Sequence, residues 1–168
     1  MVLTQSELVL SLQKEVRILL HLAGKIGRAH LDYRPTPKQR SILELLKYLT
    51  NMGPMLLRHA RGEKVDESVW GPLLAEAEAR DFDQTLAALA AHNEAYAALV
   101  GGMSDDMFRA DVAGFDGRPI SAGAFIVNQV LGQCIAYRMQ LFLYLKACGR
   151  EELNTMNLWV GVDAPMPV

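Results

Sequence analysis

The longest apolar stretch of the chain lies between Ser121 and Cys148 and predicts its most buried helix. Only two residues between Ala124 and Ala147 are charged, so a helix formed there is apolar on nearly all sides. Such a helix is either a buried core element or a membrane span. Several polar side chains inside the stretch would be costly in lipid, so we favour the buried helix. They are Asn128, Gln129, Gln133, Arg138 and Gln140.

Three further segments repeat apolar residues at helical spacing and are predicted to pack against this helix. Residues 3–28 form the first segment, and residues 42–59 form the body of the second. Gly53-Pro54 predicts a kink or an interruption in the second helix, because proline removes one backbone hydrogen bond. Residues 83–100 form the third segment.

Capping residues mark where the first two helices begin. Thr4 followed by Glu7 is a capping box, in which each residue bonds the other's backbone N–H. The second helix has two candidate starts, one at Thr36 and one at Ser41 with Glu44. Capping chemistry alone does not choose between them.

The connections complete an all-α prediction. A short helix is expected at residues 73–79. Asp116-Gly117 is a type I′ turn signal between two short β-compatible runs, so a small hairpin or an extended crossover precedes the last helix. Residues 150–168 are predicted to be irregular chain packed on the surface. Four long amphipathic helices with these connections predict an up-down-type four-helix bundle.

Length and composition indicate one soluble domain. The 168 residues suffice for one core, so we predict a single domain over residues 1–168. The net charge of −2 and the lack of a Lys/Arg-rich block argue against nucleic-acid binding. The first residues do not resemble a secretory signal. Cys134 and Cys148 would lie ~21 Å apart along one helix, beyond disulfide reach. We therefore expect a cytoplasmic protein that does not enter the membrane.

The usual signatures of metal and nucleophile chemistry are missing from the sequence. It contains no HxxxH, HExxH, CxxC or Glu-x-x-His pair, no glycine-rich phosphate loop and no Gly-x-Ser-x-Gly. Neither cysteine has a histidine or lysine at helical spacing, so both thiols are expected to be inert. We expect His21 at the surface and His92 at the edge of the third helix's apolar face. No cofactor is predicted.

Polar residues nevertheless interrupt two of the apolar helix faces. In the last helix, Gln133 and Tyr137 lie on a seam that starts at Ile126 and advances by alternating steps of four and three residues. In the third helix, Asn93 and Tyr96 lie on the predicted inner seam. Buried amide and hydroxyl groups must find hydrogen-bond partners, so these positions are candidates for a site.

Two segments resemble the DinB-like family of four-helix bundles. SILELLKYL at residues 41–49 is similar to the start of that family's second helix, roughly Ser-Ile-x-Glu-x-Leu-x-His-Leu. QCIAYRMQLFLYLKACG at residues 133–149 is similar to its fourth helix, which begins His-x-x-x-His-Arg-Gly-Gln. SDDMF at residues 104–108 and NLWVGVDAP at residues 157–165 are also typical, so the resemblance covers nearly the whole chain.

The resemblance implies where a metal would be held. The family uses three histidines, one on the second helix and two on the fourth, and the matching positions of this chain are Tyr48, Gln133 and Tyr137. A phenol with a pKa of ~10 is a poor ligand at neutral pH, and a neutral amide does not suit zinc or nickel. We therefore predict no metal there, although the family is generally described as metal-dependent enzymes, often thiol transferases.

Several functions remain open for the candidate residues. Tyr48, Gln133 and Tyr137 either fill the space of the absent ion as a hydrogen-bonded cluster or, with Asn93 and Tyr96, line a pocket for a small molecule. Our leading hypothesis is a DinB-like protein without metal-dependent catalysis that binds a small ligand inside the bundle. The alternative is a thiol-transferase or hydrolase type of enzyme that uses tyrosines in place of a metal. A purely structural dimer module would have no cavity.

We also expect self-association as a homodimer. Related bundles commonly pair, and helices rich in exposed leucine and alanine need a partner that covers them. The first helix and the Gly53-Pro54 region are candidate contact surfaces.

Overall fold

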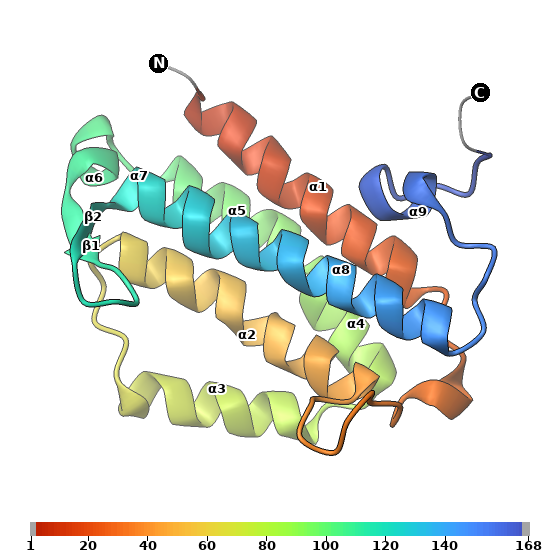
Figure 1. Ribbon diagram of the computed structural model, residues 1–168. Helices are drawn as coiled ribbons and strands as arrows, with labels where there is room; N and C mark the ends of the chain where they lie inside the picture. The colour runs from red at the N-terminus through yellow and green to blue at the C-terminus, as the bar shows by residue number, and fades with distance from the viewer. Residues whose placement is uncertain (1–2, 166–168) are drawn as a thin grey trace.

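The computed structural model describes residues 3–165 and confirms the all-α four-helix bundle (Figure 1). Its long elements are α1 (Gln5–Ala23), α2 (Ile42–Ala60), α4 (Phe82–Ala90), α5 (His92–Gly101) and α8 (Gly132–Ala147). A short helix α7 (Ala122–Phe125) and a π-helical segment η2 (Ile126–Leu131) lead directly into α8. α1 packs between α5 and α8, and α2 contacts the same two elements from the opposite side.

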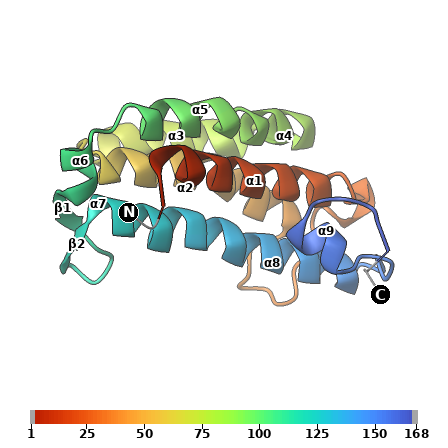
Figure 2. The same ribbon diagram turned by 90° about the horizontal axis from the view of Figure 1, so that it is seen from above.

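A crossover helix sets the direction of the third bundle element. α3 (Glu67–Ala79) lies against α2 and carries the chain back to the far end of the bundle (Figures 1 and 2). α4 and α5 therefore run in the same direction as α2, whereas α1 and α8 run the opposite way. α3 is longer than the helix expected at residues 73–79, because Asp66 caps its start by accepting a hydrogen bond from the Ser68 N–H.

Local capping chemistry determines the starts of α1 and α2. The Thr4–Glu7 capping box is formed as predicted. Of the two candidate starts for α2, the structure uses Ser41, whose N–H donates to the Glu44 carboxylate at 2.7 Å while its hydroxyl accepts from the Glu44 N–H. Such caps contribute about 1 kcal/mol each.

Two further helix boundaries differ from the prediction. α1 ends at Ala23 rather than near residue 28, and Arg28–His30 form a separate 3₁₀ turn. Gly24 follows α1 directly, and glycine is unfavourable inside a helix. The third segment is divided at Ala91 into α4 and α5. Proline does not interrupt α2, which continues through Pro54.

A hairpin precedes the last helix, one of the two arrangements expected there. β1 (Asp111–Ala113) pairs antiparallel with β2 (Pro119–Ser121), with Val112 opposite Ile120. Gly117 adopts a φ of +77°, which favours glycine. The connecting loop spans residues 114–118 and is therefore longer than a two-residue turn. α6 (Asp105–Arg109) lies just before the hairpin.

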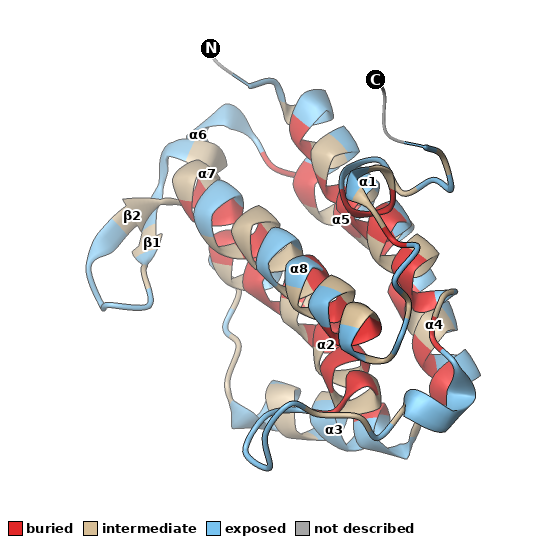
Figure 3. Ribbon diagram, turned by 45° about the vertical axis from the view of Figure 1, so that its right-hand side comes forward, coloured by how far each residue is buried: buried red, intermediate tan, exposed pale blue. Residues whose placement is uncertain are grey.

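The core runs along the centre of the bundle. Buried residues form stripes on the inward faces of α1, α2, α4, α5 and α8, while their outward faces are exposed (Figure 3). The core divides into one cluster around Leu22, Leu45 and Leu141 and another around Leu12, Phe125 and Val130. Within residues 3–165, no helix combines the length and the apolar character needed to cross a membrane.

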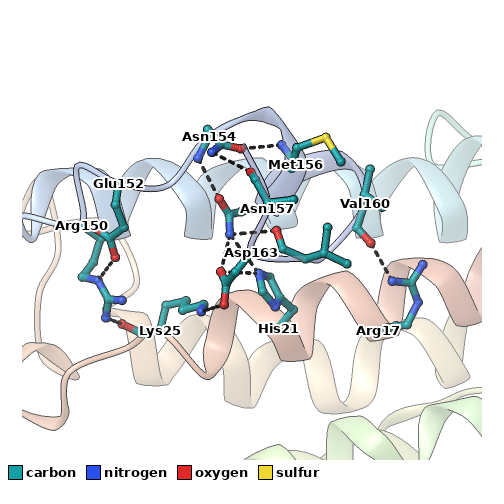
Figure 4. A network of polar contacts seen from close by, with 12 residues as sticks. Arg17, His21, Lys25, Arg150, Glu152, Asn154, Met156, Asn157, Val160 and Asp163 are labelled. Carbon is teal, nitrogen blue, oxygen red and sulfur yellow. Dashed lines mark hydrogen bonds and ion pairs between the residues drawn. The ribbon is translucent and has the colours of Figure 1, made fainter. Parts of the chain in front are cut away.

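The C-terminal segment is more ordered than predicted. It contains α9 (Thr155–Trp159) and is held on α1 by a network of polar contacts (Figure 4). Asn157 donates to Asp163 at 2.8 Å and to His21 Nε2 at 3.1 Å, and Lys25 also contacts Asp163. His21 is thus partly covered rather than at the free surface, and burial lowers its pKa despite the nearby Asp163 carboxylate. Residues 166–168 of the predicted tail lie outside the described residues.

Candidate functional site

Tyr48 of α2 and Tyr137 of α8 meet across the interface between their helices. Their ring centroids are 5.5 Å apart with the planes at 71°, an edge-to-face contact. The guanidinium of Arg40 lies 3.9 Å from the centroid of the Tyr48 ring. Burial, assisted by the neighbouring Tyr137 phenol, raises the pKa of Tyr48 to about 12. The Tyr48 phenol therefore stays protonated at neutral pH and cannot act as a base.

Tyr96 belongs to a second, deeper group. Its side chain is only 1% exposed, and its hydroxyl lies 3.3 Å from His92 Nδ1 and 4.0 Å from Cys134 Sγ. The ring lies directly against the backbone of α2 at Gly53. A Cβ atom at position 53 would fall 2.0 Å from the Tyr96 hydroxyl oxygen, so only glycine leaves room for it.

Pro54 explains why His92 is buried beside this group. In an α-helix the N–H of residue 54 would donate to the carbonyl of Thr50, but proline has no N–H. His92 Nε2 lies 2.8 Å from that carbonyl oxygen and supplies the missing donor. Nε2 therefore carries the proton, which leaves Nδ1 of the neutral ring to accept from the Tyr96 hydroxyl. Burial lowers the pKa of His92, which favours this neutral form.

The π-helical segment η2 decides which face of α8 points inward. A π turn contains more residues than an α turn, so the side chains after η2 are rotated relative to a regular helix. The predicted inner seam is therefore only partly inward: Gln133 and Tyr137 are half-buried, whereas Tyr144, which the same steps reach, is buried. The buried residues of α8 after η2 are Arg138, Leu141, Tyr144 and Leu145, and Cys134 is half-buried.

Glu15 and Arg138 form an ion pair inside the bundle. Their side chains are 8% and 2% exposed, and Arg138 Nη1 donates to Glu15 Oε1 at 2.9 Å. Arg138 Nη1 also lies 2.7 Å from Glu15 Oε2. The angles of this contact are not those of a hydrogen bond, so it is an ion pair only. Within residues 3–165, Oε2 and Arg138 Nε are the buried side-chain polar atoms without a hydrogen-bond partner. Burial raises the pKa of Glu15, and the Arg138 charge opposes this effect.

A small cavity lies among these groups. Its volume is about 20 Å³, and two residues of the predicted site, Tyr96 and Gln133, contribute to its wall. The full lining is Glu15, Val16, Leu19, Leu49, Gly53, Leu89, His92, Tyr96, Gln133 and Cys134. Burial raises the pKa of the Cys134 thiol to about 11, so this thiol stays protonated at neutral pH and is not an activated nucleophile.

The five residues of the predicted site are therefore distributed over three places. Tyr48 and Tyr137 pack together, and Tyr96 and Gln133 line the cavity. Asn93 lies in neither place, because its carbonyl accepts from Gln13 of α1 and its amide bonds the Ala90 carbonyl. The inner seam of α4 and α5 steps from Leu89 to His92. The predicted positions, Asn93 on the inner seam and His92 at its edge, were therefore both wrong.

Sequence reasoning missed Glu15, His92, Cys134 and Arg138 as a group, although signals for two of them exist. Glu15 lies three residues after Leu12 on the apolar stripe of α1, where a charge requires a partner. Pro54 inside a helix requires a donor from another element for the Thr50 carbonyl, which points to His92.

Tyr48 also borders the molecular surface. It lines a groove of about 230 Å³ between α2 and α3, together with Arg40, Glu44, Lys47, Leu74, Ala77 and Glu78. Lys47 Nζ donates to the Glu78 carbonyl at 2.6 Å, and Glu44 accepts from Arg34 and from the Ser41 N–H. Within residues 3–165, Arg40 makes no ion pair, so its N–H groups remain available beside the Tyr48 ring.

No protein-family model and no curated protein sequence matches the chain. Among solved structures, it is similar to the crystal structure of a DinB-like protein from Bacillus subtilis. The TM-score is 0.67 at 18% identity, over 88% of this chain and 95% of that chain. At this level of identity the likeness shows the fold.

The residues at the implied metal positions do not fit a transition metal. The Tyr48 phenol is held protonated, and Gln133 lines a different space from Tyr48 and Tyr137. In the described part of the chain, no three or more His, Cys, Asp and Glu side chains gather where they could hold a metal ion.

Proposed function

The chain has the DinB-like fold, and from this premise we propose that it is a metal-independent member of this fold that binds a small carboxylate at the Tyr48 groove. Binding inside the bundle has less support, because a cavity of about 20 Å³ admits nothing larger than a water molecule. We therefore place the proposed small-molecule site in the surface groove beside Tyr48 rather than in the interior of the bundle.

The observation that carries this proposal is the position of Arg40. Its guanidinium is stacked on the Tyr48 ring, which orients it without neutralising its charge. Arginine held in this way can present two parallel N–H groups to a carboxylate. The groove volume of about 230 Å³ suits a small acid, and the side chains of Leu74 and Ala77 supply apolar contacts for its body.

A thermal-shift titration tests the proposal, with benzoate as the charged probe and benzamide as its neutral counterpart. We expect benzoate to raise the melting temperature and benzamide to have a smaller effect, because a ligand that binds only the folded state stabilises it by mass action. Arg40→Gln should abolish the response. Arg58→Gln, which removes an exposed arginine paired with Glu63, should retain it. An unchanged response in Arg40→Gln, or no response to benzoate at millimolar concentration, would contradict the proposal.

The enzymatic alternative receives less support from the geometry. A pKa of about 12 keeps the Tyr48 phenol protonated, so it can donate or accept a hydrogen bond but does not act as a base. A buried acid and a buried base, Glu15 and His92, line the small cavity, but they are bonded to Arg138 and to the Thr50 carbonyl. We therefore propose binding without catalysis, in the cytoplasm, where the thiols of Cys134 and Cys148 would remain free.

We further propose a homodimer that forms through the outer face of α8. Ile135, Met139 and Leu143 recur there at four-residue steps and are 37%, 39% and 57% exposed. Gly53 is covered by Tyr96, so the Gly53-Pro54 region is less suited to an interface than this face.

Light scattering tests the interface. Leu143→Glu should convert the dimer to a monomer, because a charge would be buried in the contact. Leu10→Glu, at an even more exposed leucine on α1, should leave the dimer intact. A wild-type monomer at high micromolar concentration would exclude the proposal.

A further inference from the structure

The carboxylate oxygen Oε2 of Glu15 is buried and makes no hydrogen bond within the described residues. It belongs to a side chain that is only 8% exposed. Arg138 Nη1 lies 2.7 Å from it as an ion-pair partner, but no donor within residues 3–165 reaches it in hydrogen-bond geometry. A buried polar atom without a hydrogen bond lowers the stability of the fold, and more so when its group is charged. Native proteins therefore almost always supply a partner, often an ordered water molecule.

The adjoining cavity has the size and the lining that a water molecule requires. Its volume of about 20 Å³ exceeds the roughly 10–15 Å³ that one water needs. Glu15 itself lines it, and so do the polar side chains of Tyr96, Gln133 and Cys134. An empty cavity is normally apolar throughout, which this one is not.

The directions of the neighbouring hydrogen bonds leave acceptors and donors free for such a molecule. Because His92 Nε2 donates to Thr50, the Tyr96 hydroxyl donates its proton to His92 Nδ1. The lone pairs of the Tyr96 oxygen can then accept. The Gln133 amide can donate to the water oxygen, and Glu15 Oε2 accepts only.

We propose that this cavity binds one ordered water molecule, which donates a hydrogen bond to Glu15 Oε2 and bonds the Tyr96 or Gln133 side chain on its other side. The water connects Glu15 of α1 with Tyr96 of α5 or Gln133 of α8, and therefore joins the buried ion pair to the polar wall of the cavity. Arg138 does not line the cavity, so this water does not provide a hydrogen-bond partner for Arg138 Nε.

A high-resolution crystal structure of the full chain is the first test. We expect one density peak at about 2.7–3.2 Å from Glu15 Oε2. An empty cavity in the wild-type crystal would overturn the proposal.

Oxygen-17 relaxation dispersion, which counts water molecules with long residence times, is the second test. Val16→Ile adds one methylene to the cavity wall, whereas Val130→Ile adds the same group to a buried site away from the cavity. We expect Val16→Ile to lose one long-lived water and Val130→Ile to lose none. An unchanged count in a folded Val16→Ile protein would refute the proposal. If that variant does not fold, the wild-type crystal structure still decides.

Discussion

Gly53→Ala tests the close approach of Tyr96 to α2, because the same substitution has opposite effects at two helical glycines. In a helix interior, replacing glycine with alanine normally gains about 1 kcal/mol of stability. At Gly132 of α8, the nearest atom to an added Cβ is the Val127 carbonyl oxygen at 3.7 Å, an ordinary contact. Gly132→Ala should therefore stabilise the protein or leave it unchanged.

At Gly53 the added Cβ would lie 2.0 Å from the Tyr96 hydroxyl oxygen and 2.9 Å from its Cζ atom. The tyrosine must move, although its side chain is buried and its hydroxyl is bound to His92. Overpacking costs about 1–3 kcal/mol and a lost buried hydrogen bond about 1–3 kcal/mol. After the gain in helix propensity, we expect Gly53→Ala to destabilise the fold by about 2–4 kcal/mol.

Urea unfolding followed by circular dichroism measures both variants. Tyr96→Phe removes the hydroxyl that makes the shortest contact, so Gly53→Ala should cost less in that background than in the wild type. The double-mutant cycle isolates this coupling between adjacent side chains. If Gly53→Ala proves as stable as Gly132→Ala, the tight packing of Tyr96 on α2 is refuted.

Three further predictions concern the buried polar groups. Arg138→Met should destabilise the protein by about 3–5 kcal/mol because it leaves Glu15 buried without its cation. The double variant Glu15→Leu with Arg138→Met should recover most of that loss. Additive effects of the two substitutions in urea unfolding would contradict this. Burial lowers the pKa of His92, so the stability it contributes above about pH 6.5 should be lost as the pH falls. His92→Gln should therefore flatten the dependence of the unfolding free energy on pH. An unchanged pH dependence in that variant would assign it to other groups. Trp159→Ala should uncover Arg138, whose guanidinium lies 5.1 Å from the Trp159 ring centroid, and lower the melting temperature, whereas Val162→Ala serves as the control and should cost less.

Much of the fold follows from local sequence because helix formation and capping are local events. Ser41 and Glu44 lie three residues apart, so the capping box that starts α2 needs no other part of the chain. The apolar stretch after Ser121 identified the buried last helix for the same reason, since its pattern is visible within the segment. The resemblance to DinB-like proteins placed Tyr48 and Tyr137 at matching positions, and the structure brings their rings into contact.

The candidate site depended on how each helix is rotated about its own axis, and a regular periodic pattern does not show a change in that rotation. The extra residue in the π turn of η2 rotated Arg138 inward, and the step from Leu89 to His92 moved Asn93 off the inner seam. One residue corresponds to about 100° around a helix, so either shift exchanges a buried side chain for one at the edge.

The sequence by itself determined the helices, their caps and the residue types available to the interior. Only the tertiary structure decided that the Thr50 carbonyl released by Pro54 would be met by His92, and that Glu15 would be met by Arg138. The physical reason is that a buried polar group can be satisfied by any donor or acceptor that packing brings within about 3 Å. These partners lie 42 and 123 residues apart along the chain, so folding alone brings them together.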